Sequence, residues 1–111
     1  MSDLATQPVQ TINKDTPLLK QSDIAAFIAQ LNGWQVSAEV KIISRSFHFK
    51  NYYQTISFVN ALAWIAHQTD HHPELQVEYN RCLVKYTTHS IDALSINDFI
   101  CAARIDKLDV E

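Results

Sequence analysis

Four of the five histidines of this 111-residue chain fall between residues 67 and 89. His67 and His71 are four residues apart, so on a helix they would share one face. His72 follows directly, and His89 falls at the end of a predicted strand. An imidazole has an ordinary pKa of about 6.5 and exchanges protons near neutrality. Two or three such groups around a small substrate could protonate a leaving hydroxyl and remove a proton elsewhere, which amounts to a dehydration.

The spacing of His67 and His71 is also typical of helical zinc sites, and His89 could supply a third ligand. However, Gln68 occupies the position of the general-base glutamate in a His-Glu-x-x-His motif. We therefore expect a site without metal or cofactor, with zinc as the sharper alternative. His48, on the polar face of a predicted strand, is expected to be an ordinary surface residue.

Composition excludes several other classes of function. The formal net charge is -3 and no basic run is present, which argues against a nucleic-acid partner. Gly33 is the single glycine, whereas phosphate loops and dinucleotide-binding turns need several. Residues 56–66 form the longest apolar tract, which is too short to span a bilayer, and residues 1–20 lack the apolar stretch of a signal peptide. We expect a soluble, cytoplasmic protein without membrane contact. Cys82 and Cys101 are expected to be buried thiols.

Hydrophobic periodicity predicts the elements that position the histidines. The expected order is a helix, two strands, a helix, two strands and a final helix. They cover residues 22–31, 34–38, 41–50, 51–70, 75–79 and 81–88, and the last helix begins after residue 95. Ser22 and Asn51 are the expected N-caps of the first two helices. Ser95 and Asp98 form a capping-box pattern, and Pro73 must follow the end of the second helix.

The connections between the strands indicate the fold class. Glu39 and the Asn80-Arg81 pair are the expected turns of two β-hairpins. Strands joined in this way predict an α+β fold, in which a four-stranded antiparallel sheet has helices packed on one face, in the order α-β-β-α-β-β-α. Residues 1–16 are expected to be a flexible N-terminal arm, and residues 17–111 a single domain. Two unpaired sheet edges favour a homodimer or homotetramer.

The same residues have the spacing of a known enzyme signature. Its positions here are His67-x-x-x-His71-His72-Pro73, then Tyr79, His89 and Asp98. Shorter matches are Gly33-Trp34, Phe47-His48-Phe49-Lys50 and Thr87-Thr88-His89. From about Leu18 to the C-terminus, the chain resembles the pterin-4a-carbinolamine dehydratases.

The resemblance implies an activity and the residues that carry it. The family converts 4a-hydroxytetrahydropterin to quinonoid dihydropterin and water, a step that recycles the tetrahydrobiopterin cofactor of aromatic amino acid hydroxylases. His71 is then the leading acid–base residue, while His72 and His89 are catalytic residues that also bind the pterin. The implied partners are a small pterin substrate, further copies of the chain and, functionally, a hydroxylase.

Four further positions have supporting roles in this interpretation. Pro73 and Thr88 are expected to line the pterin pocket, and His67 and Asp98 to support it. Many members of the family carry glutamate at the position of His67 and tryptophan at the position of Leu75. At the third position of its helix, Asp98 is as well explained by helix capping as by catalysis.

Two other functions are compatible with the sequence. The chain could be a non-enzymatic dimerisation or regulatory partner of another protein, because some relatives act in this way. It could also dehydrate another pterin, for example in molybdopterin metabolism. The intact histidine cluster favours an enzyme, because a pure binding module has no need of it.

Overall fold

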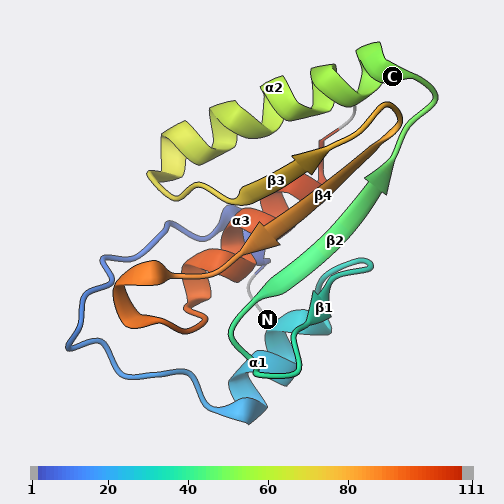
Figure 1. Ribbon diagram of the computed structural model, residues 1–111. Coiled ribbons are helices and arrows are strands. Elements are labelled where there is room, and N and C mark those ends of the chain that lie inside the picture. The colour runs from blue at the N-terminus through green and yellow to red at the C-terminus, as the bar shows by residue number, and fades with distance from the viewer. Residues whose placement is uncertain (1–2, 109–111) are drawn as a thin grey trace.

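The computed structural model describes residues 3–108 of the chain. Within this part, helices and strands follow one another in the predicted order, α-β-β-α-β-β-α (Figure 1). The elements are α1 (Gln21–Ile28), β1 (Gln35–Val36), β2 (Ile43–His48), α2 (Tyr52–Thr69), β3 (Glu74–Val77), β4 (Arg81–Tyr86) and α3 (Ile96–Asp106). Two short 3-10 helices, η1 (Leu4–Thr6) and η2 (His89–Ile91), lie near the N-terminus and after β4. The predicted fold class is confirmed.

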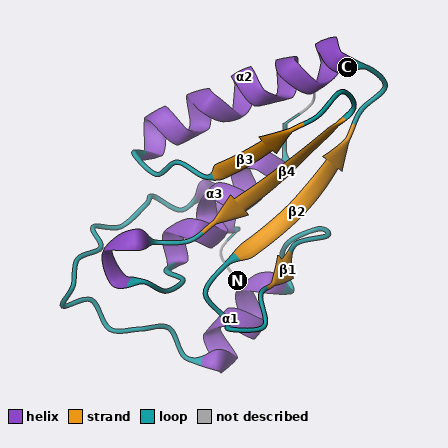
Figure 2. Cartoon of the chain, in the orientation of Figure 1, coloured by secondary structure: helices purple, strands orange, loops and turns teal. Residues whose placement is uncertain are grey.

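The four strands form an antiparallel sheet in the order β1-β2-β4-β3 (Figure 2). The central pair is β2 and β4, which align Ile43 with Tyr86 and Phe47 with Cys82. The helices cover the face of the sheet that carries these four side chains. Strands β1 and β3 are therefore the two edges of the sheet within the described residues.

The core follows the alternation expected for a half-buried strand. Cys82, Val84 and Tyr86 are each 0% exposed, which confirms the predicted buried face of β4. Helix α3 is buried on nearly all sides, because it lies behind the sheet and is covered from outside by the N-terminal segment. Both cysteines are buried and free, as predicted.

The ends of α2 and α3 follow the predicted capping chemistry. The Asn51 side chain accepts a hydrogen bond from the backbone N–H of Gln54 at 3.0 Å, as an N-cap should. Ser95 and Asp98 form a complete capping box at the start of α3. At its other end, α2 stops at Thr69, because Asp70 adopts the left-handed conformation with φ of 50°.

Helix α1 differs from the prediction at both ends. Its N-cap is Lys20, not Ser22, because the Asp23 carboxylate accepts the backbone N–H of Lys20 at 3.1 Å. The helix ends at Ile28, three residues earlier than expected. Gly33, with φ of 75°, closes the turn that follows rather than the helix itself.

The strands are shorter than predicted, and one turn is shifted. Strand β1 keeps only two residues, Gln35 and Val36, and Glu39 lies in the expected turn before β2. In the β3–β4 hairpin, the N–H of Glu78 donates to the carbonyl of Arg81 at 2.8 Å. The central residues are thus Tyr79 and Asn80, so the predicted Asn80-Arg81 turn is wrong by one position.

The N-terminal segment lies against α3. Leu4 is only 1% exposed, and the Arg104 guanidinium donates hydrogen bonds to the carbonyls of Ala5 and Gln7, at 3.2 and 2.8 Å. The polar composition of residues 1–16 did not indicate this contact. Residues 1–2 of the predicted arm and residues 109–111 of the predicted domain lie outside the described residues.

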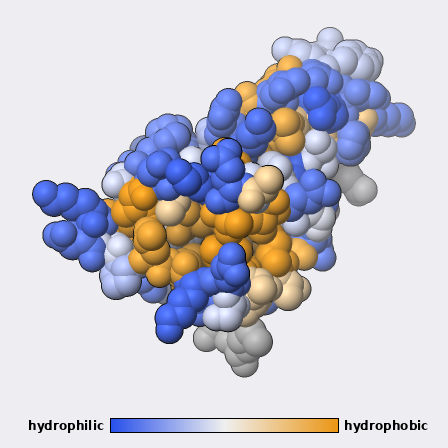
Figure 3. Space-filling view, turned by 60° about the horizontal axis from the view of Figure 1, so that its bottom comes forward, coloured by the Kyte–Doolittle hydropathy of each residue, from blue (hydrophilic) through white to orange (hydrophobic). Residues whose placement is uncertain are grey.

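One face of the molecule carries a gathering of exposed apolar side chains, bordered by hydrophilic ones (Figure 3). A hollow of about 500 Å³ lies between the N-terminus of α1, the turn before β2 and the loop after η2. Its lining includes Ile24, Val40 and Leu94 but no histidine. Among residues 3–108, no helix has both the length and the apolar character needed to cross a membrane.

Candidate active site

His71 is placed by the way in which α2 ends. Because Asp70 turns into the left-handed conformation, His71 leaves the helix, and its N–H donates to the carbonyl of Ala66 at 3.1 Å. The side chain of His71 therefore does not continue the helical face that carries His67. The prediction that these two histidines share one helix face is wrong, and the left-handed residue between them is the physical reason.

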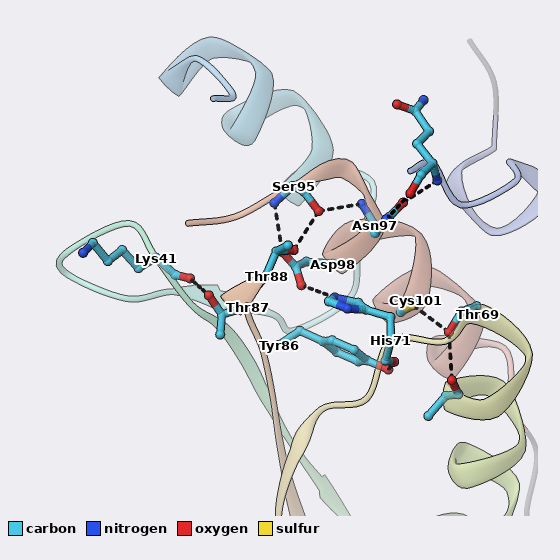
Figure 4. A network of polar contacts seen from close by, with 12 residues as sticks. Lys41, Thr69, His71, Tyr86, Thr87, Thr88, Ser95, Asn97, Asp98 and Cys101 are labelled. Carbon is cyan, nitrogen blue, oxygen red and sulfur yellow. Dashed lines mark hydrogen bonds and ion pairs between the residues drawn. The ribbon is translucent and has the colours of Figure 1, made fainter. Parts of the chain in front are cut away.

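The His71 ring points toward the first turn of α3, where it meets a buried carboxylate (Figure 4). Its Nε2 atom lies 2.6 Å from Oδ1 of Asp98, which is 0% exposed. The ring also stacks on Tyr86, with centroids 5.1 Å apart and an angle of 28° between the planes. The Tyr86 hydroxyl donates to the carbonyl of His71 at 3.1 Å. These contacts fix both the backbone and the ring of this histidine.

Asp98 has two sets of contacts, one for each carboxylate oxygen. Oδ1 faces His71, while Oδ2 accepts the Thr88 hydroxyl at 2.8 Å and the backbone N–H of Ser95 at 2.9 Å. The hydroxyls of Thr88 and Ser95 are themselves 2.7 Å apart. Asp98 can therefore be both the helix cap and the partner of His71. Its two carboxylate oxygens make the two contacts separately.

The geometry specifies how the His71 imidazole can exchange protons. An ionised carboxylate only accepts hydrogen bonds, so the contact with Asp98 requires a proton on Nε2 of His71. The other ring nitrogen, Nδ1, is then the atom that can release or accept a proton. A carboxylate behind a histidine also fixes the orientation of the ring. The pair has the elements of an acid–base catalyst.

A hollow of about 350 Å³ adjoins His71. This volume lies within the range of small-molecule sites. Thr69, Asp70 and His71 contribute to its lining, as does Thr88, which is only 6% exposed. The remaining lining residues are Gln10, Thr11, Ile12, Ser90 and Asn97. Sequence reasoning missed the N-terminal residues and Asn97, because no motif or periodicity singles them out.

His72 and His89 line a different hollow from His71. Both are exposed, and both line a smaller hollow of about 90 Å³ to which Tyr86 and Thr87 also contribute. Pro73 is half-buried directly before β3, between His72 and the sheet. Three of the predicted histidines therefore lie near the end of β4, His71 in one hollow and His72 and His89 in another.

His67 is not part of this arrangement. It is exposed on α2, its ring centroid lies 5.7 Å from that of Trp64, and it lines neither hollow. Across residues 3–108, no three His, Cys, Asp or Glu side chains come together in a way that could hold a metal ion. The larger hollow of about 500 Å³ near α1 also lacks histidines. We therefore place the candidate site at the end of β4, where histidines line the hollows, although these hollows are smaller.

Two buried groups next to His71 are held in their protonated forms. Burial raises the pKa of the Tyr86 hydroxyl far above its usual value, and it also raises the pKa of the Cys101 thiol. The Cys101 sulfur lies 3.5 Å from the Thr69 hydroxyl, behind the site. Neither group is suited to carry a charge, so neither is a candidate for proton exchange in this region.

The fold and this site define a small α+β protein with three histidines that line hollows at one end of its sheet. A family model described as pterin 4 alpha carbinolamine dehydratase matches residues 17–108. A relative from Nitrosospira multiformis, whose name places it among these dehydratases, is 52% identical over 108 residues, covering 97% of this chain and 94% of its own. A relative from Nitrosomonas eutropha with the same name is 50% identical over 107 residues, covering 96% of this chain and 93% of its own. The chain belongs to the pterin-4a-carbinolamine dehydratase family, whose enzymes are hydro-lyases.

Solved structures agree with this assignment. The crystal structure of a transcriptional coactivator/pterin dehydratase from Brucella melitensis superposes with a TM-score of 0.76 at 32% identity, covering 80% of this chain and 95% of that one. A pterin dehydratase-like protein, identified as a RuBisCO assembly factor in the alpha-carboxysome, has a TM-score of 0.59 at 22% identity. It covers 68% of this chain and 87% of its own, and at that identity it supports the fold alone.

Proposed function

We propose that this protein dehydrates 4a-hydroxytetrahydropterin to quinonoid dihydropterin by histidine acid–base catalysis, in the recycling of tetrahydrobiopterin. The observation that carries the proposal is the 2.6 Å contact between His71 Nε2 and Asp98 Oδ1, beside a hollow of about 350 Å³. A positioned imidazole next to a ligand-sized hollow meets the first requirement of proton transfer to a small substrate.

The reaction needs one proton delivered and one removed. The C4a–oxygen bond breaks as the hydroxyl takes up a proton and leaves as water. The N5 proton is lost as the C4a–N5 double bond forms, so the proton count is balanced. In the proposed mechanism, Nδ1 of His71 exchanges a proton at one of these two positions. An imidazole from His72 or His89 serves the other.

Binding is assigned to the side of the site that faces solvent. In the proposed binding mode, a pterin at the end of β4 contacts His71 through one hollow and His72 and His89 through the other. The imidazoles of His72 and His89 can hydrogen-bond the polar edge of a pterin. Thr88 lines the pocket and also orients Asp98, while Pro73 fixes the chain where it turns into β3.

Turnover is the direct test of this proposal. Freshly generated 4a-hydroxytetrahydropterin dehydrates slowly in buffer, and catalytic amounts of protein should accelerate the appearance of quinonoid dihydropterin above that background. Protein treated with a chelator should be equally active, because the proposed groups need no metal. A folded protein that leaves the background rate unchanged would favour the non-enzymatic, regulatory alternative instead.

We also propose a cytoplasmic homodimer or homotetramer that serves an aromatic amino acid hydroxylase. The sheet has two edges, and β1 is too short to protect the edge that it forms. On α2, Tyr53 is 81% exposed and Trp64 is 61% exposed, which leaves large aromatic side chains without cover in a single copy. Light scattering at micromolar concentration should give the mass of two or four chains, and a monomer would contradict this assignment.

A further inference from the structure

The hollow beside His71 has a wall that does not come from the helices or the sheet. Gln10, Thr11 and Ile12 of the N-terminal segment line it. These residues lie outside residues 17–108, the part of the chain that the family model matches. The family model itself therefore does not include this wall.

A single buried side chain holds the wall in place. Asn97 is 8% exposed and makes two opposed hydrogen bonds with the backbone of Gln10 (Figure 4). Its Oδ1 accepts the Gln10 N–H at 2.8 Å, and its Nδ2 donates to the Gln10 carbonyl at 2.7 Å. Further upstream, the Arg104 guanidinium bonds the carbonyls of Ala5 and Gln7. All four bonds are made to the main chain of the segment.

This mode of attachment leaves the side chains of the wall free for contact with a ligand. Gln10 and Thr11 are exposed, and Ile12 is half-buried. Asn97 and Asp98 are neighbours in the first turn of α3, so one rigid turn carries both the anchor of the wall and the partner of His71. The distance between the wall and the reactive imidazole is therefore set by a helix rather than by a free loop.

We propose that Gln10–Ile12 is a substrate-selecting wall that contacts the substituent at C6 of the pterin. This inference rests on the proposed function, because it takes the reacting C4a to lie at His71. The C6 substituent is the variable part of natural pterins and extends away from the reacting carbon. The wall offers the amide of Gln10, the hydroxyl of Thr11 and the apolar side chain of Ile12. Such a mixture suits a short alkyl chain that carries hydroxyl groups.

The test compares two substrates that differ only at C6, the 6-methyl and the 6-(1,2-dihydroxypropyl) forms of 4a-hydroxytetrahydropterin. In the double variant T11A/I12A, KM for the dihydroxypropyl substrate should rise about 5- to 10-fold, the usual effect of losing one hydrogen bond with some apolar contact. For the 6-methyl substrate KM should change less than about 2-fold, and kcat should be nearly unchanged for both, because only binding of the substituent is affected.

Two further variants distinguish a loss of substrate selection from a loss of folded protein. Asn97→Ala frees the wall without altering its side chains, so it should lower the preference for the dihydroxypropyl substrate in the same direction. Thr6→Ala is the matched control, because Thr6 is exposed in the same segment and lines neither hollow. Its KM values should equal those of the wild type. Circular dichroism should show the same folded content in all variants.

Each result of these kinetic and binding measurements either supports or contradicts the inference. If the wild type turns over both substrates and the double variant keeps the wild-type ratio of kcat/KM between them, the wall does not select and the inference is wrong. If the wild type turns over neither substrate, the proposed function fails separately. In that case the affinity for a 6-(1,2-dihydroxypropyl)-7,8-dihydropterin, measured by its fluorescence, decides instead. An equal Kd in the wild type and the double variant overturns the inference, and a weaker Kd in the variant supports it.

Discussion

His71 and His72 are neighbours in the chain but have opposite surroundings. The side chain of His71 is 16% exposed, its ring is stacked on Tyr86, and its Nε2 is 2.6 Å from a carboxylate. His72 is exposed and, together with His89, borders a separate, smaller hollow. The surroundings of His71 thus fix the orientation of its ring, whereas His72 and His89 are accessible to a ligand.

The difference follows from the end of α2. The left-handed Asp70 ends the helix and His71 reaches Asp98 of α3, whereas His72, directly before Pro73 and β3, is exposed. Proton transfer requires atoms held within a few tenths of an ångström, whereas binding tolerates side chains that adapt to the ligand. We therefore expect substitutions on the His71 side to lower kcat the most, and substitutions of His72 or His89 to raise KM in addition to a smaller decrease of kcat.

The largest expected effect is that of His71→Ala. Removal of a positioned general acid or base lowers kcat by about 10²–10⁴-fold. Rates must be measured above the uncatalysed dehydration, and circular dichroism must show an intact fold. A loss of less than about 10-fold would mean that His71 is not the principal proton-exchanging group, since that is the scale of a supporting residue.

Asp98→Asn should have the next largest effect. The amide keeps the size of the side chain but loses the charge that orients the imidazole, so kcat should fall by about 10- to 100-fold. The buried cap is weakened as well, and the free energy of unfolding should decrease by about 1–3 kcal/mol. Ser95→Ala separates the two effects, because it removes a cap worth about 1 kcal/mol while leaving the carboxylate beside His71. If both variants lower kcat equally, helix capping rather than charge explains the loss.

His72→Ala and His89→Ala, made one at a time, should raise KM and also lower kcat, although either imidazole can partly replace the other in the second proton transfer. Each removes one polar contact to the pterin, so KM should rise about 10-fold while kcat falls less than it does in His71→Ala. Steady-state kinetics over a wide range of substrate concentration separates the two parameters. A decrease of kcat as large as that of His71→Ala would erase the distinction between the two sides of the site.

The smallest effect is expected for His67→Ala. Its ring is exposed beside Trp64 and lines neither hollow. Surface substitutions of this kind usually change free energies by less than about 0.5 kcal/mol, which corresponds to about 2-fold in kcat/KM. A much larger loss, with the fold and the oligomeric mass unchanged, would show that His67 takes part in the chemistry.

Sequence patterns predicted the elements whose signals are local. The caps Asn51 and Ser95 and the alternating buried residues of β4 each depend on a few neighbouring positions, and all are found where expected. The direction of His71 was not predictable from its spacing to His67. The left-handed residue that breaks the helix is an aspartate, which adopts this conformation much less readily than glycine.

The N-terminal wall was missed for another physical reason. Asn97 and Arg104 hold the segment through its backbone carbonyls and one N–H, which every residue type except proline can offer. Such contacts leave no pattern of side chains along the segment. Its polar, aperiodic sequence therefore resembles that of an arm without contacts.

The dual use of Asp98 has a consequence for the tolerance of the chain to mutation. A replacement at this position must satisfy the Ser95 N–H and the Thr88 hydroxyl with one oxygen and His71 with the other. Asparagine has the right length but no charge, while glutamate has the charge but one methylene too many for a buried position. In a library of all substitutions in the first turn of α3, we expect position 98 to accept the fewest. Redesign of this helix end for heat resistance would have to keep aspartate there.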